Sequence, residues 1–286
     1  MTDGRTIVQE TARVLLAGKA GTYHELTLVA PRIAALVEPG QFVQARTGAA
    51  GPAGFALRRP FSVHAADRRR AGVGTISIVF EVVGPGTAAL ATARVHDHID
   101  LLGPLGRPFS PPAEPAPCLL VGGGYGAAPL FLLAERLVAA GCRVDMVLGA
   151  ASAGRLLKPV DAKRHVATLA LTTDDGSAGR AGLVTDALGP GLERAKARGG
   201  TLYACGPMPM LAAVAHAAAA AGVPAQVAVE ERMACGTGIC FSCVLPMVGG
   251  RLARSCTDGP VFDAGAIAWG ELGLGSGAAA VGERVP

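Results

Sequence analysis

Aromatic side chains are scarce in this sequence: they make up 4% of its 286 residues, and only one is a tryptophan. Glycine, by contrast, occurs 40 times, and alanine is also abundant. Such small residues favour tight turns and close packing between neighbouring elements. Half of the residues are hydrophobic, so there is ample material for real cores. The length suits about two domains with a small third.

A strong charge and long apolar runs are lacking too. The formal net charge is only +4, and the arginines are scattered except at Arg68-Arg69-Arg70, which we interpret as a solvated turn between two strands. This argues against a nucleic-acid-binding surface. No apolar run reaches the roughly 18–20 residues that span a bilayer, and residues 1–10 lack a basic-then-apolar signal pattern. We therefore expect a cytoplasmic protein that binds neither nucleic acid nor a membrane.

Most of the cysteines gather near the end of the chain. Those four, spaced C-x4-C-x2-C-x12-C, are Cys235, Cys240, Cys243 and Cys256. Gly236 and Gly238 let the backbone between the first two curl tightly and turn its N–H groups inward. A loop of this kind can place thiolates around one small object and donate hydrogen bonds to its sulfurs. The spacing is that of plant-type [2Fe–2S] clusters, in which four thiolates hold two irons.

Two other roles for these cysteines, as zinc ligands or in disulfides, fit less well. Structural zinc usually takes two short C-x-x-C knuckles or a mixture of cysteine and histidine. Here only Cys240 and Cys243 form such a knuckle, and no histidine is near. Disulfides would need favourable geometry from three cysteines crowded on a glycine-rich loop, and nothing else indicates secretion. A [2Fe–2S] cluster is the preferred interpretation.

The first part of the chain predicts short strands. Between residues 5 and about 110, alternating and β-branched residues are punctuated by glycine and proline, which favours an antiparallel barrel or sandwich. Within it, Arg59-Pro60-Phe61-Ser62 combines groups that suit a large, anionic, planar ligand; the alternative is a buried aromatic beside a surface arginine. Gly86 and Thr87 precede a predicted helix and suit either a phosphate or an ordinary N-cap.

From about residue 116 the pattern changes. After the proline-rich segment 110–117, apolar strands alternate with helices, which predicts a parallel sheet. Gly122-Gly123-Gly124 and Gly126 follow the first of these strands, where small residues let a backbone approach a pyrophosphate. Cys205-Gly206-Pro207 ends a later strand, at the sheet edge where such folds bind ligands.

These patterns predict a multidomain protein. We expect an antiparallel β-barrel in residues 1–112, a nucleotide-binding α/β domain with a parallel sheet in 113–223, and a small [2Fe–2S] domain in 224–264. Residues 265–286 lack a clear period, and we expect a flexible tail, in which Trp269 offers a side chain able to dock.

The motifs together resemble a known family. The order R-P-F-S, G-x-G-T, C-G-P-x-P-M and then a cysteine loop resembles the ferredoxin reductase superfamily. Within it, E-R-M-A-C-G-x-G-x-C-x-x-C and C-x-D-G-P-V-F resemble the electron-transfer subunits of dihydroorotate dehydrogenase B. The resemblance implies FAD, a [2Fe–2S] cluster and NAD, and a catalytic partner that carries FMN, in a heterotetramer with two of each subunit. Electrons would run from dihydroorotate through FMN, the cluster and FAD to NAD⁺, in pyrimidine biosynthesis.

The resemblance also implies roles for individual residues. The flavin would be held by Arg59, Pro60, Phe61 and Ser62. A second group of residues would contact the nucleotide and phosphates of the flavin: Val79, Phe80, Glu81, Gly86 and Thr87. Phe61 lacks the hydroxyl of the tyrosine common in the superfamily, and Glu81 stands where a basic residue is frequent. Cys205 either lies near the redox rings or only packs. We assign no catalytic acid or base, because the redox chemistry belongs to the cofactors.

Other functions remain open at this stage. Related iron–sulfur flavoprotein subunits of sulfhydrogenases or ferredoxin:NAD(P) oxidoreductases share the stretch Thr173–Ser177, and a non-enzymatic redox-sensing regulator is a third class. The sequence also does not decide between NAD and NADP, since Arg155 or Arg180 could meet a 2′-phosphate.

Overall fold

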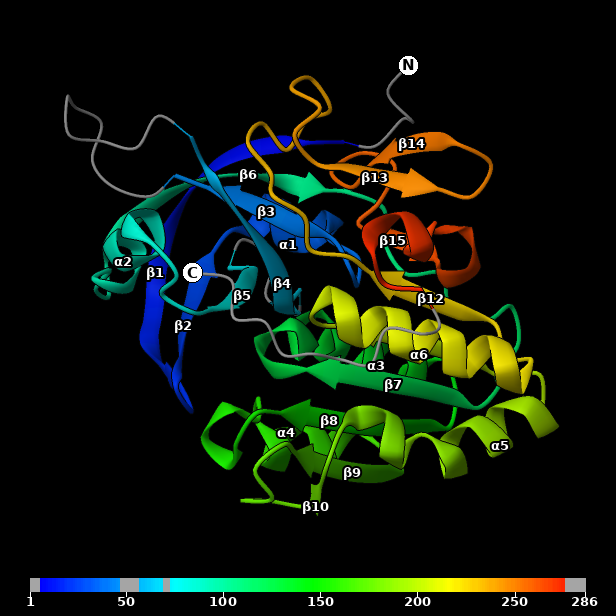
Figure 1. Ribbon diagram of the computed structural model, residues 1–286. Helices are drawn as coiled ribbons and strands as arrows, with labels where there is room; N and C mark the ends of the chain where they lie inside the picture. Colours follow the sequence, from blue (N-terminus) through cyan, green and yellow to red (C-terminus); the bar gives the residue numbers. More distant parts are fainter. Residues whose placement is uncertain (1–5, 47–56, 69–72, 276–286) are drawn as a thin grey trace.

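The computed structural model describes residues 6–46, 57–68 and 73–275. A closed barrel lies beside a layered α/β unit, and a small hairpin with the cysteine loop projects from the edge where the two meet (Figure 1). This is the predicted fold class. No helix in the described ranges is both long enough and apolar enough to cross a membrane.

The barrel is built from six antiparallel strands, in the spatial order β1-β2-β5-β4-β3-β6. Their bounds are β1 (Val8–Ala20), β2 (Tyr23–Val29), β3 (Phe42–Ala45), β4 (Arg59–Asp67), β5 (Thr75–Phe80) and β6 (His98–Leu105). The expected alternation is present on β3, where Val43 and Ala45 enter the barrel core while Phe42 faces away from it. Two short helices, α1 (Pro31–Leu36) and α2 (Pro85–Ala91), cover the barrel, and only α2 was expected.

The α/β unit has a sheet in the order β10-β9-β8-β7-β11-β12-β15. The strands are β7 (Cys118–Gly123), β8 (Val144–Ala150), β9 (Thr168–Thr173), β10 (Arg180–Ala181), β11 (Thr201–Cys205), β12 (Ala225–Ala228) and β15 (Val261–Asp263). All neighbours are parallel except β12 and β15. Its α-helices are α3 (Ala128–Ala139), α4 (Pro159–His165), α5 (Gly189–Ala197) and α6 (Met208–Ala221). Helices α3 and α4 pack on one face, and α5 and α6 on the other. Short 3₁₀ turns are η1 (Gly124–Ala127), η2 (Ala153–Arg155) and η3 (Val184–Ala187).

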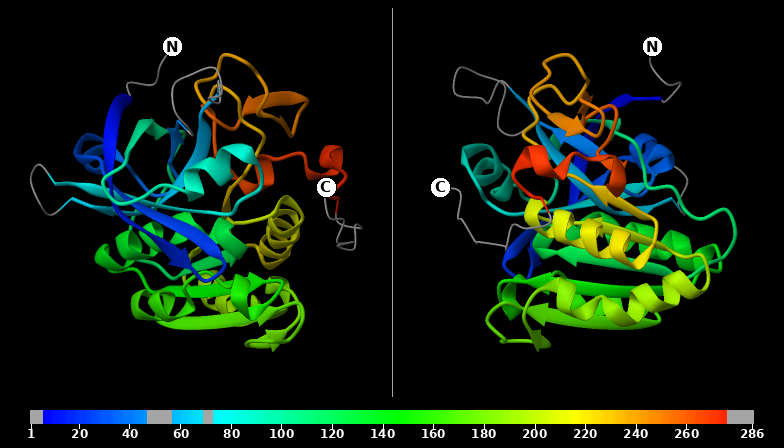
Figure 2. Two further views of the ribbon diagram at one scale, coloured as in Figure 1. Left: turned by 90° about the vertical axis from the view of Figure 1, so that its left-hand side faces the viewer. Right: turned by 45° about the vertical axis from the view of Figure 1, so that its right-hand side comes forward.

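The cysteine loop leaves and rejoins this sheet. It begins after β12 and carries the hairpin β13 (Val244–Met247) and β14 (Arg251–Arg254). The chain then returns as β15, antiparallel to β12. In Figure 2 the hairpin stands above the sheet edge, close to the barrel. The segment expected as a separate unit, 224–264, thus contributes its first and last strands to the α/β sheet, which anchors both ends of the cysteine loop.

The segment after residue 264 was expected to be a flexible tail, but residues 265–275 are packed. They form η4 (Ala264–Ala266) and η5 (Trp269–Leu272). Trp269 is only 6% exposed, joins the core beside α6 and β13, and donates its indole N–H to the carbonyl of Ala264 at 2.9 Å. Burial of this ring is what orders the segment. The rest of the expected tail, 276–286, lies outside the described residues.

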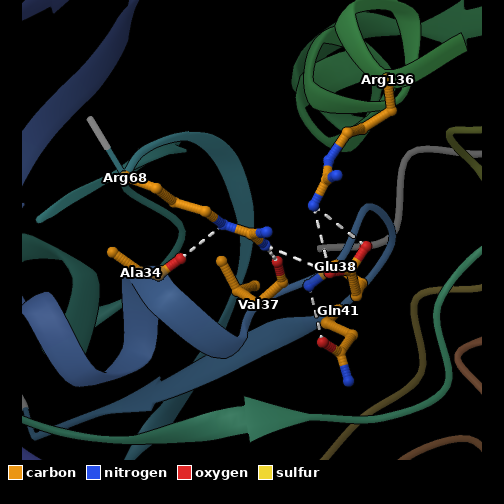
Figure 3. Close-up of polar contacts among 6 residues, drawn as sticks. All are labelled: Ala34, Val37, Glu38, Gln41, Arg68 and Arg136. Atoms are coloured by element: carbon orange, nitrogen blue, oxygen red, sulfur yellow. Dashed lines mark hydrogen bonds and ion pairs between the residues drawn. The ribbon is translucent and has the colours of Figure 1, made fainter. Parts of the chain in front are cut away.

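Glu38 ties the barrel to the α/β unit (Figure 3). Its carboxylate accepts from Arg136 of α3 at 3.1 Å and from Arg68 at 3.2 Å. Arg68 also donates to the carbonyls of Ala34 and Val37 at the end of α1, a position where a cation is favourable. Arg68 therefore fastens α1 instead of lying in solvent as expected. Its two neighbours in the arginine triplet lie outside the described residues.

A second contact between the two units is buried. His64 of β4 is 4% exposed; its Nδ1 lies 3.0 Å from the carbonyl oxygen of Ala128, at the start of α3. Its ring meets the edge of Phe131 with centroids 4.8 Å apart. The barrel and the sheet therefore share a packed interface, and it fixes the strands that carry the predicted motifs relative to one another.

Candidate cofactor and electron-transfer site

A pocket of about 560 Å³ opens at the carboxyl ends of the parallel strands. Sequence-predicted residues that line it are Gly123, Gly124, Gly126, Gly206 and Pro207. They come from the turns after β7 and β11, which are neighbours in the sheet. This is the edge where open α/β sheets bind ligands.

Close approach of the two turns explains why glycines are needed there. A Cβ on Gly126 would lie 2.7 Å from the Cα of Gly206, and one on Gly122 would lie 2.5 Å from the Cβ of Ala127. Gly124 has a φ of +55°, in the left-handed region that disfavours side chains. Gly122 thus allows the close packing of Ala127 behind the turn. Gly123, Gly124 and Gly126 leave the backbone exposed to the pocket, as a pyrophosphate requires.

The barrel supplies one wall of the pocket, which sequence reasoning missed. Tyr23 of β2 lines it and donates its hydroxyl to the carbonyl of Arg155 at 2.8 Å. Its ring meets Tyr125 edge-on, with centroids 5.7 Å apart, and the guanidinium of Arg155 lies 5.8 Å from its centroid. Nothing in the local pattern of β2 distinguishes this tyrosine from any other strand aromatic.

Glu230 also lines the pocket and was not predicted as a site residue. The hydroxyl of Tyr125 donates to its carboxylate at 3.4 Å. Enclosure raises the pKa of Glu230, and this hydrogen bond only partly opposes the effect. Burial, together with the charge of Glu230, raises the pKa of the Cys205 thiol. Cys205 is 7% exposed and is not among the lining residues, so in this structure it is a neutral packing thiol beneath the pocket.

The predicted flavin motif lies on β4, beside β3. Pro60 is paired with Gln44, Phe61 with Val43, and the half-buried Ser62 with Phe42. Phe61 is 7% exposed, and its ring lies 5.4 Å from that of Phe80 on β5.

Arg59 of this motif and the preceding Arg58 differ in their contacts. Arg58 pairs with Asp100 at 2.6 Å and also donates to its carbonyl. Arg59 instead donates to the carbonyls of Leu57 and Arg58, so its guanidinium stays at the end of β4. Arg58 is thus held by an acidic residue of β6, and Arg59 by backbone carbonyls at the start of β4.

Strand β5 leads from this motif to the pocket. Phe80 contacts Phe61, Val79 belongs to the core shared with the α/β unit, and Glu81 pairs with Arg155 at 2.7 Å. An acidic residue at position 81 is thus matched by an arginine from the other unit.

Gly86 and Thr87 lie in the first turn of α2. The Thr87 hydroxyl accepts hydrogen bonds from the backbone N–H groups of Val83 and Gly84, at 2.9 and 3.2 Å, and donates to the carbonyl of Gly84. Thr87 is thus the N3 residue of a capping box whose N-cap is Gly84, which fits the helix-capping role that the sequence left open.

The four predicted cluster ligands come together as two pairs. The backbone N–H of Cys240 points to the sulfur of Cys235, and Cys243 and Cys256 lie in one buried cluster. Burial, together with the neighbouring thiol of Cys243, raises the pKa of Cys256 to about 12. Cys243 and Cys256 are buried, whereas Cys240 is exposed. Among the described residues, no three acidic, cysteine or histidine side chains gather tightly enough for one metal ion. Two adjacent pairs are what two bridged irons need.

The loop around Cys235 is a nest of backbone donors. The N–H groups of Thr237, Ile239 and Cys240 point to the Cys235 sulfur at 3.4 to 3.5 Å. Although burial alone would raise it, these donors lower the pKa of the Cys235 thiol to about 6. Positive φ angles at Gly236 (68°) and Gly238 (84°) allow this curl. The donor set therefore fits a thiolate-bound cluster.

Comparison with known proteins gives a consistent result. Residues 230–268 match the family described as "Iron-sulfur cluster binding domain of dihydroorotate dehydrogenase B". The chain is 41% identical over 249 residues to "Dihydroorotate dehydrogenase B (NAD(+)), electron transfer subunit" of Geobacillus thermodenitrificans, covering 85% of this chain and 92% of that protein. The protein of the same name from Desulforamulus reducens is 36% identical, with 84% and 90% covered.

Solved structures extend the comparison. A chain of an NADH-dependent reduced ferredoxin-NADP oxidoreductase, studied for flavin-based electron bifurcation, is 32% identical with a TM-score of 0.79, covering 94% of this chain and 92% of that one. The ferredoxin reductase in carbazole 1,9a-dioxygenase is 19% identical with a TM-score of 0.63, covering 77% and 68% of the two chains, and shares the fold.

Proposed function

The chain belongs to the electron transfer subunits of dihydroorotate dehydrogenase B, and on that premise we propose that it carries electrons from a dihydroorotate-oxidising subunit to NAD⁺. One observation supports this most. The paired cysteines, the β4 motif and the nucleotide pocket are consecutive neighbours, linked by β3 and β5. Electron transfer from one bound cofactor to the next requires that the sites be adjacent.

The residues would divide among three bound groups. Cys235, Cys240, Cys243 and Cys256 would hold a [2Fe–2S] cluster. FAD would lie on the barrel against Arg59, Pro60, Phe61 and Ser62, with Val79, Phe80, Glu81, Gly86 and Thr87 toward its nucleotide. NAD would enter the pocket over Gly122, Gly123, Gly124 and Gly126, with Gly206 and Pro207 opposite and Cys205 beneath.

The cofactors supply the redox chemistry: the flavin exchanges hydride with NAD and single electrons with the cluster. The chain's own residues position and enclose them. The nest after Cys235 offers N–H groups to its sulfur, and Cys243 and Cys256 are buried against Phe42 and Leu105, which keeps water away from that pair.

The partner would be an FMN-containing catalytic subunit, in a cytoplasmic assembly of two of each. The exposed side of the cysteine loop supports a docking role. Ile239 is 79% exposed and Phe241 62% exposed, and they flank Cys240, the exposed cysteine of the four. Apolar side chains presented beside an exposed ligand suit a protein surface that receives or delivers electrons.

Reconstitution tests this function. The purified chain alone should reduce dyes with NADH but should not oxidise dihydroorotate; adding the catalytic subunit should couple dihydroorotate oxidation to NAD⁺ reduction, followed as NADH absorbance. Cys240→Ser should abolish the coupling and spare dye reduction, while Cys142→Ser, a buried cysteine outside the loop, should retain both. If the two subunits keep their cofactors yet do not couple, the assignment fails.

A related function has one observation in its favour, the similarity to the ferredoxin-NADP oxidoreductase chain. In that case reduced ferredoxin, not dihydroorotate, would drive NAD(P)⁺ reduction in the same assay. Bleaching of the bound flavin by NADH would separate either enzyme from a redox-sensing regulator.

A further inference from the structure

Strand β3 separates the cysteine loop from the β4 motif. Side chains alternate along a strand, so Phe42 and Gln44 share the face opposite to Val43 and Ala45. Val43 and Ala45 belong to the barrel core, whereas Phe42 packs with Cys243 and Cys256. Gln44 therefore points to the side of the predicted cluster.

The amide of Gln44 is buried without hydrogen bonds. Its exposure is 0%, and within the described part of the chain neither Nε2 nor Oε1 has a partner. A buried amide without hydrogen bonds is destabilising, and native structures keep few of them. An apolar side chain would fill the same space without this cost.

The amide also lies against the cysteine loop. A Cβ on Gly236 would be only 2.3 Å from Nε2 of Gln44, so no side chain at position 236 can separate the amide from the loop. Gly236 directly follows Cys235, whose sulfur receives the backbone donors of the nest. On the other side, Gln44 is the strand partner of Pro60 in the flavin motif. One buried amide thus lies between the two predicted redox sites.

We propose that Gln44 donates an amide N–H to a sulfur of the bound cluster near Cys235 and raises the cluster's reduction potential. The proposal rests on the cluster assigned above. A donor to sulfur stabilises the reduced form more than the oxidised form, because the reduced cluster carries one more negative charge. The bound cluster would satisfy the amide.

The matched comparison is Gln44→Met against Gln41→Met. Methionine keeps the length of glutamine and removes its donor. Gln41 is also buried, but both ends of its amide are hydrogen-bonded: Oε1 accepts from the N–H of Glu38 at 2.8 Å (Figure 3), and Nε2 donates to the carbonyl of Gly106 at 2.8 Å. Redox titration of the purified, cluster-loaded chain, with the reduced cluster followed by electron paramagnetic resonance, gives the potential.

Gln44→Met should shift the cluster's midpoint potential to a lower value and alter its resonance spectrum, with iron content and flavin potential unchanged. Gln41→Met should lower thermal stability and leave the cluster potential unchanged. A parent chain with no cluster would refute the proposed function. A loaded Gln44→Met with the parent's potential and spectrum would refute only the role of Gln44.

If Gln44→Met does not retain the cluster, a measurement on a chain that keeps Gln44 tests the proposal. The Gln41→Met chain, labelled with ¹⁵N at glutamine side-chain amides, should show hyperfine coupling between ¹⁵N and the reduced cluster. Its absence would overturn the proposal.

Discussion

The carboxylate of Glu81 and the guanidinium of Arg155 lie 2.7 Å apart and join the end of β5 to the wall of the nucleotide pocket. Hydrogen bonding to Glu81 raises the pKa of Arg155. Among the described residues that line the pocket, Arg155 is the one basic side chain, and Asp174 adds a negative charge. A neutralised arginine and a carboxylate disfavour the 2′-phosphate of NADP, which agrees with an NAD-linked role.

Glu81→Gln should therefore raise the use of NADPH relative to NADH. The pair is partly exposed, so we expect an effect of about 1 kcal/mol, or roughly fivefold in the ratio of kcat/KM values. Dye reduction with each coenzyme measures it. The control is Glu25→Gln, which breaks another ion pair between the two units, to Lys158 at 2.6 Å, away from the lining residues. An unchanged ratio in Glu81→Gln would contradict this explanation of selectivity.

Gly126→Ala should weaken nucleotide binding. Its Cβ would meet backbone of Gly206 at 2.7 Å, so the two turns must move apart. Overpacking costs typically about 1–3 kcal/mol, and we expect the KM for NADH to rise about tenfold while flavin and iron contents stay at parental levels. At Gly154 an added Cβ meets nothing closer than 3.6 Å, so Gly154→Ala should behave as the parent. Equal KM values in the two variants would argue against the role of this close approach.

His64 should make stability depend on pH on the acid side. Burial lowers the pKa of His64 below its ordinary 6.5, and the Ala128 carbonyl only partly opposes this. The unfolded chain thus binds more protons below about pH 6.5, so this contribution is fully present above that pH and is lost as the pH falls. The slope is at most about 1.4 kcal/mol per pH unit.

Urea unfolding between pH 7.5 and 5 measures this slope. His64→Asn should flatten the decline, because asparagine keeps a donor near the Ala128 carbonyl and does not titrate. His98→Asn, at an exposed barrel position, should leave the slope unchanged. A parental slope in His64→Asn would contradict the prediction.

Trp269→Ala should destabilise the whole chain even though this residue follows the last sheet strand. Removing a buried aromatic ring costs about 3–5 kcal/mol, and the hydrogen bond to Ala264 is lost as well. Chemical denaturation of Trp269→Ala and of the control Val138→Ala, at a half-exposed position on α3, measures the loss in the free energy of unfolding for each variant. A loss no larger than that of the control would mean that residues 265–275 add little to the fold.

Phe241→Ser should weaken the complex with the catalytic subunit. This phenylalanine is 62% exposed, has a φ of 58° and lies under the guanidinium of Arg254 at 5.3 Å, so it is presented outward next to Cys240. An aromatic anchor at an interface is worth about 2 kcal/mol or more, which is over tenfold in the dissociation constant. Binding would be measured by calorimetry on cluster-loaded chains. The control Val160→Ser, at a position on α4 that is 69% exposed, should bind as the parent does. If Phe241→Ser also binds as the parent does, docking occurs elsewhere.

The sequence by itself determined the local features of this protein. The short strands of the barrel, the parallel sheet and the turn after β7 follow from short-range patterns, since side-chain alternation and glycine punctuation act within a few residues. The cysteine spacing predicted a loop, and Gly236 and Gly238 predicted its inward N–H groups. These features depend on backbone conformation that neighbouring residues set.

Only the tertiary structure decided which distant residues meet. The side of β3 that carries Gln44 faces the cysteine loop because β3 pairs with β4 and the loop returns to the sheet edge through β15. Tyr23 reaches the pocket and Glu81 finds Arg155 across the contact between the two units. Trp269 is buried because it packs into a core that side chains of β13 and α6 share. Each contact joins residues far apart in the chain, and the free energy that selects it comes from burial and pairing across elements, which no local pattern contains.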